Sequence, residues 1–170
     1  LKAGQVLVAC PASVVPVWQE EIQRFYPATP VEVLRADNLP GENSAASIWL
    51  ASYTQLRRNR KTLEQVSFAY LLLDEAQFIK NPDAKTTQAC LSLKARHRIA
   101  LTGTPVENRP QDLWTLFRFL MPGLLDNRRR LEEQFKANAD EALSHLRRQL
   151  KPFVLRRSKK AVAKDLPEKV

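Results

Sequence analysis

The chain has 170 residues, of which 44% are hydrophobic and 26% are charged, and its formal net charge at pH 7 is +9. This composition is typical of a soluble globular protein, and no apolar run approaches the roughly 20 residues that span a bilayer, so we expect no membrane partner. Two cysteines, Cys10 and Cys90, are too few for a disulfide framework or a zinc site, so we expect two buried thiols in a reducing compartment.

Short apolar runs alternate with helical patterns between residues 6 and 101. The expected strands are Val6–Cys10, Val31–Leu34, Ile48–Tyr53, Phe68–Leu73 and Arg98–Leu101. Apolar residues at helical spacing predict one helix through Trp18, Ile22 and Phe25, and another through Thr86, Cys90 and Leu93. This alternation predicts βαβ units, and therefore a three-layer α/β domain with a parallel sheet.

From Pro110 onward the pattern is helical only. Pro110 suits a first helical turn, an apolar stripe follows it, and Met121-Pro122-Gly123 ends that helix. Two more helices are expected before Pro152. We therefore divide the chain into an α/β lobe at residues 1–106, a helical protrusion at 107–165, and the start of a linker at 166–170.

The strongest apolar run, Phe68–Leu73, ends in two adjacent carboxylates, Asp74 and Glu75. A strand that delivers two acids to its tip is typical of the Walker B segment of P-loop ATPases, although a plain strand-to-turn boundary gives the same pattern. At such a tip Asp74 is expected to hold Mg²⁺. Glu75 is expected to orient and deprotonate the water that attacks the nucleotide.

A second polar turn, Thr102-Gly103-Thr104, follows the next predicted strand. Because ligands gather at the carboxyl ends of parallel strands, we expect its hydroxyls to reach the two carboxylates or their bound water. They would then report whether the γ-phosphate is present. An ordinary turn before Pro105 is the alternative for this segment taken alone. The two segments in this order favour a nucleotide site.

Positive charge is concentrated in residues 128–160. This segment contains eleven Lys or Arg and four Asp or Glu, which gives it a net charge of +7. A basic surface attracts polyanions such as nucleic acid, but a solvated helical face has the same composition.

Nearly the whole chain resembles the SWI/SNF-type ATPases of helicase superfamily 2, which move along double-stranded DNA. The matching segments are Val6–Ser13 with Trp18 and Glu21, Ala51–Thr54, Asp74–Gln77 with Ile79–Asn81, Leu101–Pro105 with Glu107 and Asn108, Leu113-Trp114, Phe119-Leu120, Pro122-Gly123, Phe153–Lys159 and Asp165–Pro167. The first four look like the family's motifs Ia, Ib, II and III. The resemblance implies a RecA-like lobe that uses ATP and Mg²⁺, duplex DNA as a partner, and a second RecA-like lobe beyond Val170.

The resemblance also implies roles for single residues. Asp74 would hold the metal, Glu75 would be the base, and Gln77 would couple both to the nucleotide-binding turn at Thr102, Gly103 and Thr104. The expected contacts with DNA phosphates are Pro11, Ser13, Ser52, Thr54, Arg156 and Arg157. Hydroxyls and backbone N–H groups at strand ends position a DNA strand without reading its sequence. Ser13 and Thr54 have a structural alternative, which is to cap the helices that follow them. Arg156 and Arg157 also have a structural alternative, which is to form part of the solvent-exposed surface of a helix.

The chain departs from the family's pattern in two respects. Its four glycines form no G-x-x-x-x-G-K-[ST] loop, which cradles the triphosphate and in the family precedes the strand that begins here at Val6. We therefore expect a part of a longer protein that by itself binds ATP weakly and hydrolyses it negligibly. In the family the loop's strand lies beside the strand ending at Thr102, so we also expect self-association at that edge. Gln77 stands where many relatives carry His, but Gln keeps a donor and an acceptor.

Two other interpretations stay open. An RNA helicase or restriction-type translocase of the same superfamily shares these motifs, although Leu155-Arg156-Arg157 and the helical protrusion favour the duplex translocases. The second interpretation is a binding module that holds nucleic acid or a protein without catalysis. Such a module would not need both carboxylates, which counts against it. The expected location is inside the cell, with bacterial cytoplasm or nucleoid favoured over a nucleus because of Gln77.

Overall fold

The computed structural model describes residues 4–41, 47–103, 110–125 and 127–155, without the side chains of residues 110 and 111. Thr104, Arg156, Arg157 and the expected linker at 166–170 therefore lie outside the described residues. The chain divides into two compact units, Leu1–Arg128 and Arg129–Val170. Among the described helices, none has the length and apolar character that crossing a membrane requires.

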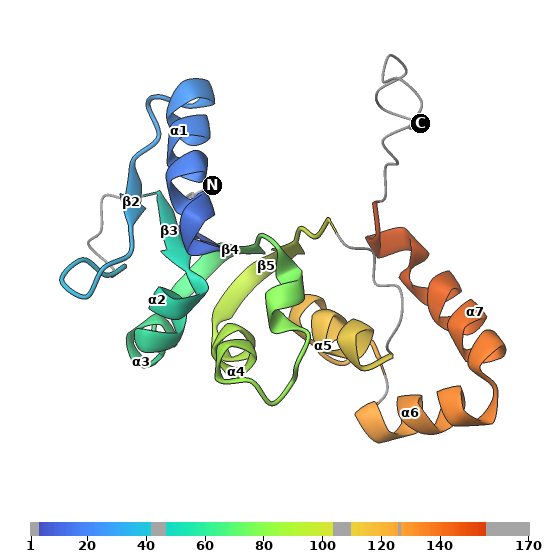
Figure 1. The fold of residues 1–170 in the computed structure, drawn as a ribbon. Coiled ribbons are helices and arrows are strands. Elements are labelled where there is room, and N and C mark those ends of the chain that lie inside the picture. Colours follow the sequence, from blue (N-terminus) through green and yellow to red (C-terminus); the bar gives the residue numbers. More distant parts are fainter. Residues whose placement is uncertain (1–3, 42–46, 104–109, 126, 156–170) are drawn as a thin grey trace, which may run out of the picture. The chain divides into compact units, whose positions relative to one another are not determined.

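Five parallel strands form the sheet of the first unit (Figure 1). They are β1 Val6–Cys10, β2 Val31–Val33, β3 Ile48–Ser52, β4 Ser67–Leu73 and β5 Lys94–Ala100, in the spatial order β2-β3-β1-β4-β5. β1 lies in the middle, between β3 and β4, and its residues Leu7 and Ala9 are fully buried. A continuous apolar run is what a strand buried on both faces requires. The predicted parallel sheet is confirmed.

Helices cover both faces of this sheet, which gives the three predicted layers (Figure 1). On one face α1 (Val15–Phe25) packs Val15 and Ile22 against Val8, Cys10 and Leu50. The other face carries α2 (Tyr53–Arg58), α3 (Arg60–Leu63), α4 (Lys85–Ser92) and α5 (Pro110–Leu120). Their larger core joins Leu56, Leu63, Cys90 and Phe119 to Leu7, Trp49 and Leu71 of the strands.

The end of β3 differs from the prediction because a helix cap lies there. The apolar run predicts a strand to Tyr53, whereas Tyr53 begins α2. The hydroxyl of Ser52 accepts the backbone N–H of Gln55 at 3.2 Å, and the Gln55 side chain accepts the backbone N–H of Ser52 at 2.7 Å. This reciprocal pair is a capping box, which satisfies two N–H groups at the helix start.

β5 is longer than its sequence pattern predicts, since it begins at Lys94 rather than at Arg98. Lys94 and Arg96 are exposed, and these polar residues interrupt the apolar pattern that would indicate the first half of the strand. The basic segment 57–61 likewise shows no strong period, and it belongs to the two short helices α2 and α3.

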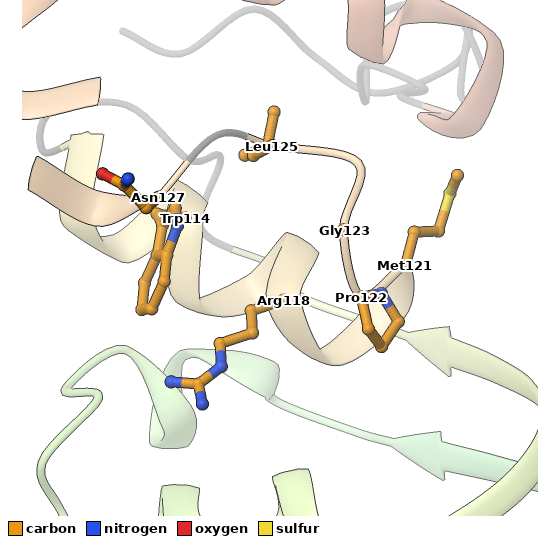
Figure 2. A pocket seen from close by; sticks show the side chains of 7 residues that line it. All are labelled: Trp114, Arg118, Met121, Pro122, Gly123, Leu125 and Asn127. Carbon is orange, nitrogen blue, oxygen red and sulfur yellow. The ribbon is translucent and has the colours of Figure 1, made fainter. Parts of the chain in front are cut away.

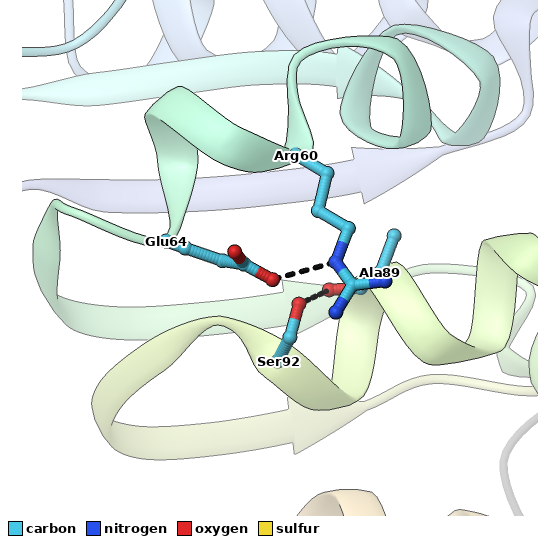
Figure 3. A network of polar contacts seen from close by, with 4 residues as sticks. All are labelled: Arg60, Glu64, Ala89 and Ser92. Atoms are coloured by element: carbon cyan, nitrogen blue, oxygen red, sulfur yellow. Dashed lines mark hydrogen bonds and ion pairs between the residues drawn. The ribbon is translucent and has the colours of Figure 1, made fainter.

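Two polar contacts lie close together, one at α3 and one at the end of α4 (Figure 3). Arg60 of α3 forms an ion pair with Glu64, and the hydroxyl of Ser92 donates to the carbonyl of Ala89 at 2.9 Å. The Ser92 hydroxyl, and then the Arg60 guanidinium, lower the pKa of Glu64. A lowered pKa means that the ion pair between Arg60 and Glu64 weakens only as the pH falls toward the acidic range.

The helix α5 packs into the α/β core, although the sequence places it in the protrusion that begins at residue 107. Phe119 is fully buried in the main core, and its carbonyl accepts the Arg98 guanidinium of β5 at 2.8 Å. The first unit consequently extends to Arg128. As predicted, α5 ends before Met121, and Gly123 forms the turn with a φ of 92° that favours glycine.

The second unit contains the two further helices that the sequence predicts. α6 spans Arg128–Ala137 and α7 spans Ala139–Leu150, followed by the short helix η3 at Lys151–Phe153. Asn138 caps α7, because its side-chain oxygen accepts the N–H of Glu141 at 3.2 Å.

Candidate functional site

The carboxyl ends of β1, β4 and β5 bring the predicted site residues to one edge of the sheet. Asp74 donates its backbone N–H to the carbonyl of Ala9 at 2.8 Å, which ties the end of β4 to the end of β1. On the other side, Leu101 donates its N–H to the carbonyl of Leu73 and accepts the N–H of Ala76, both at 2.8 Å. The acidic pair and the turn after β5 therefore meet at the tip of a parallel sheet.

A run of hydrogen bonds joins Glu75 to Thr102 through Gln77. The amide nitrogen of Gln77 donates to Oε2 of Glu75 at 2.7 Å, and its oxygen accepts the Thr102 hydroxyl at 3.0 Å. The Gln77 side chain lies between Glu75 and Thr102, the two segments that it was expected to couple. It fills this position because its amide carries a donor and an acceptor. We call this run, Glu75–Gln77–Thr102, the polar relay.

Asp74 is held by hydrogen bonds from three segments. Its Oδ1 accepts the N–H of Glu75, and its Oδ2 accepts the indole N–H of Trp18, both at 2.9 Å. Its backbone carbonyl accepts the hydroxyl of Tyr53 at 2.8 Å. Burial, with smaller contributions from acidic neighbours that include Asp74, raises the pKa of Tyr53, so this hydroxyl remains a donor. Each carboxylate oxygen has two lone pairs and keeps the capacity for a second partner.

Glu75 has an unusual backbone conformation. Its φ of 52° and ψ of 53° lie in the left-handed region, and within the described residues no other non-glycine residue has a positive φ. Such a conformation costs on the order of 1–3 kcal/mol and persists where surrounding contacts fix it. Here the fixing contacts are the polar relay and the N–H of Phe78, which donates to the Glu75 carbonyl at 3.0 Å. Strain stored at this residue is the kind that clusters at functional sites.

The oxygen donors at this edge fit a magnesium ion shared with a nucleotide. Mg²⁺ usually takes one or two carboxylates and completes its shell with waters and substrate phosphates. Asp74 and Glu75 supply two carboxylates, and Thr102 is exposed beside them. No group of three or more His, Cys, Asp or Glu in the described ranges is arranged to hold a metal.

Gly103 follows Thr102 and is exposed. A Cβ atom added there would meet nothing within 4 Å, and its φ lies outside the left-handed range. Among the described residues, neither packing nor backbone geometry requires a glycine at this position.

The predicted DNA-contacting residues lie after β1 and β3. Pro11 follows β1 directly, and Ser13 is exposed in the short helix η1 at Ala12–Val14. No side chain caps α1, so Ser13 does not fill its alternative role. Thr54 is exposed in the first turn of α2, and the cap is Ser52 instead. Ser52 is only 7% exposed and its hydroxyl oxygen accepts the N–H of Gln55, so its side chain stabilises the first turn of α2.

The contacts of Trp18 and Tyr53 with Asp74 have no signal in the sequence pattern. Trp18 stands out only as part of a helical stripe and of the Ia-like segment, and Tyr53 only as the expected end of a strand. The contacts join residues 56 and 21 positions apart, so they become visible only in the fold.

Neither cysteine is expected to react in the folded chain. Both side chains are fully buried. Burial, helped by the charge of Asp74, raises the pKa of Cys10 to about 11, and burial raises that of Cys90 to about 12. At pH 8 the thiolate fraction of Cys10 is thus about 100-fold below that of a thiol with the ordinary pKa of 9.0. We expect iodoacetamide at pH 8 to alkylate both thiols in guanidinium and neither in buffer, as measured by mass spectrometry. Fast alkylation of the native chain would contradict the burial.

A pocket of about 190 Å³ lies at the end of α5 (Figure 2). It is lined by Trp114, Arg118, Met121, Pro122, Gly123, Leu125 and Asn127. The guanidinium carbon of Arg118 lies 5.1 Å from the centre of the Trp114 ring, as a cation–π pair. The lining contains no carboxylate and none of the predicted site residues, so this pocket is distinct from the acidic edge.

The chain is similar in sequence to one family over almost its whole length. Residues 2–170 match the SNF2-related domain. An uncharacterized ATP-dependent helicase of Mycoplasma genitalium is 39% identical over 171 residues, which cover 96% of this chain and 16% of that protein. The TATA-binding protein-associated factor MOT1 of Saccharomyces cerevisiae is 35% identical over 185 residues, which cover 96% of this chain and 10% of that protein.

The fold is similar to that of the Sulfolobus solfataricus SWI2/SNF2 ATPase core in complex with dsDNA. The TM-score is 0.86 at 38% sequence identity, over 97% of this chain and 36% of that chain. The predicted RecA-like class is thereby confirmed. The chain spans only a minor part of each of these relatives. With the family's domain matched over nearly every residue and the fold shared, this chain belongs to the SNF2-related domain family.

Proposed function

We propose that this SNF2-related domain supplies the carboxylates that face magnesium and ATP in a motor that moves on duplex DNA. The observation that carries the proposal is the polar relay at the tip of the sheet. It connects the acidic turn after β4 to the turn after β5, so that a change at either turn alters the other. The ATP-dependent helicase among the relatives supports the same activity.

In this proposal each polar side chain has a distinct task. Asp74 holds Mg²⁺, which when bound neutralises charge on the phosphate oxygens of ATP. Glu75 orients a water molecule and accepts its proton, while the Gln77 amide fixes the Glu75 carboxylate through the 2.7 Å hydrogen bond. Thr102, with Gly103 and Thr104, senses the γ-phosphate and passes its state to Gln77 through the 3.0 Å hydrogen bond.

The DNA-facing residues in this proposal are Pro11, Ser13 and Thr54, together with Arg156 and Arg157. The exposed hydroxyls of Ser13 and Thr54 stand at the same edge as the acidic pair, after β1 and β3. Contacts of this type go to phosphates and are independent of base sequence. The solved Sulfolobus relative, a complex with dsDNA, supports duplex DNA as the partner. We accordingly propose that the protein acts inside the cell, where DNA is found.

The proposal includes two parts that the 170 residues do not contain. They have no G-x-x-x-x-G-K-[ST] loop to cradle the triphosphate, and they do not include the second RecA-like lobe that the resemblance implies. We therefore expect the chain by itself to bind ATP weakly and to release negligible phosphate. Measurable turnover by the purified chain would contradict this assignment.

Binding of the purified chain to duplex DNA tests the DNA-facing surface. Fluorescence anisotropy with a labelled duplex, over a range of salt concentrations, gives the affinity and the number of phosphates contacted. Thr54→Glu places a negative charge on the proposed surface, and the first turn of a helix tolerates an acid well. Ser67→Glu is the matched control, since Ser67 is exposed at the opposite end of β4.

We expect Thr54→Glu to weaken duplex binding by about tenfold, because losing one phosphate contact costs roughly 1.4 kcal/mol of binding free energy. Ser67→Glu should leave duplex binding unchanged. Equal effects of both substitutions would show that the sheet edge is not the binding surface. An RNA duplex of the same length should bind more weakly, and tighter binding of RNA would favour the helicase alternative.

We also predict that the chain forms a dimer through β5. In the part of the chain that the structure describes, β5 pairs only with β4, and Tyr70, Ile99 and Leu101 beside it are about two-fifths exposed. Open strand edges next to apolar side chains pair with further strands. Lys94 and Arg96 are exposed on β5 and repel a second copy, so the dimer should strengthen with salt. Sedimentation at two salt concentrations measures this, and a monomer at high protein and high salt would contradict it.

A further inference from the structure

Asp74 is anchored from α1, which directly follows the short helix with Ser13, and from α2, which carries Thr54. Trp18 belongs to α1, which follows Ser13, and its indole N–H donates to the Asp74 carboxylate at 2.9 Å. Tyr53 begins α2 beside Thr54, and its hydroxyl donates to the Asp74 backbone carbonyl at 2.8 Å. One anchor acts on the side chain of Asp74, and the other acts on the strand end that carries it.

The two hydrogen bonds are separable from the packing of the rings. Trp18 is half-buried against the small apolar cluster on the α1 face. Tyr53 is 5% exposed, and its ring stacks on Phe78 with centroids 5.1 Å apart and planes 9° apart. Tyr53→Phe keeps the ring and loses only the hydroxyl, whereas Trp18→Phe keeps an aromatic ring but loses the indole N–H together with part of the ring system. The polar atoms therefore have a role that filling the core does not explain.

We infer that Trp18 and Tyr53 are positioning residues for Asp74, with the indole fixing the rotamer of its carboxylate and the phenol fixing its backbone. The inference rests on the proposed function, because it concerns a carboxylate that holds a metal. Groups that hydrogen-bond to such a ligand typically change metal affinity by about 10- to 100-fold when they are removed. The two residues also connect the DNA-facing segments to the metal-holding side chain.

The first experiment tests the hydrogen bond between Trp18 and Asp74 in the isotope-labelled chain by NMR. The three tryptophans, Trp18, Trp49 and Trp114, give three indole N–H signals, and Trp18→Phe identifies one of them by removing it. Asp74→Asn replaces a charged acceptor with a neutral one, so the Trp18 signal should move upfield more than the other two. A Trp18 signal that does not respond to Asp74→Asn would overturn the inference.

The second experiment measures metal affinity with Mn²⁺ as a paramagnetic substitute for Mg²⁺. Broadening of the backbone N–H signal of Glu75 during the titration gives a dissociation constant for each variant. We expect Trp18→Phe and Tyr53→Phe each to raise this constant by about tenfold. Trp114→Phe is the control for loss of an indole, because Trp114 lies on α5, and it should leave the constant unchanged. Thermal unfolding of each variant separates a loss of affinity from a loss of fold.

The outcomes distinguish this inference from the proposed function. If Mn²⁺ broadens the Glu75 signal of the unmodified chain neither alone nor with ATP added, the metal site of the proposed function is wrong. If Mn²⁺ binds there and both phenylalanine variants bind it as tightly as the unmodified chain, the metal site stands and the positioning role is wrong.

Discussion

Replacing Glu75 with Gln is expected to lower ATP turnover by about 10²- to 10⁴-fold, which is the usual contribution of a positioned general base. This applies to a protein that joins the domain to a phosphate-binding loop and a second RecA-like lobe. The Gln side chain keeps an oxygen that accepts from the Gln77 amide, so the polar relay survives while the base is lost. Duplex affinity should not change, because Ser13 and Thr54 are untouched. Phosphate release at saturating ATP and duplex measures the effect.

Glu20→Gln is the matched control for this substitution. Glu20 is exposed on α1, so its loss removes the same charge without touching the polar relay, and turnover should stay unchanged. Turnover close to that of the unmodified protein in Glu75→Gln would show that another group is the base.

Replacing Phe119 with Ala is expected to destabilise the chain by about 3–5 kcal/mol, the usual cost of deleting a buried aromatic ring. Phe119 is fully buried in the main core, and the Arg98 guanidinium carbon lies 5.3 Å from its ring centre. The free energy of unfolding from guanidinium titration measures the effect. Phe25→Ala is the control, since Phe25 is 63% exposed and its loss should cost less than about 0.5 kcal/mol. Equal costs would mean that α5 does not belong to the α/β core.

The sheet was predictable because parallel strands buried on both faces read as continuous apolar runs. Val6–Cys10 and the run before Asp74 appear in the structure almost at their predicted limits. β5 was harder to delimit, because an edge strand exposes polar side chains such as Lys94 and Arg96. The placement of α5 was not predictable, since its amphipathic stripe shows that it packs on something but not on which surface.

The meeting of the two polar turns was predictable from topology, because neighbouring parallel strands end at the same edge. The residue pattern alone left the path between them open, although the resemblance assigned the coupling to Gln77. Whether Thr102 reaches a carboxylate directly or through Gln77 depends on the turn after β4, where the left-handed backbone of Glu75 redirects the chain. The contacts of Trp18 and Tyr53 with Asp74 also depend on where α1 and α2 settle on the sheet, which no local pattern encodes.

Phosphate release from ATP, measured with and without duplex DNA on the protein that carries this domain, tests the central claim most directly. The claim is that Asp74 and Glu75 serve a magnesium-bound nucleotide. We predict turnover that requires Mg²⁺, rises when duplex DNA is added, and rises less with an RNA duplex of equal length. A protein that binds duplex DNA tightly yet releases no phosphate in the presence of Mg²⁺ would contradict the claim and favour a binding module without catalysis.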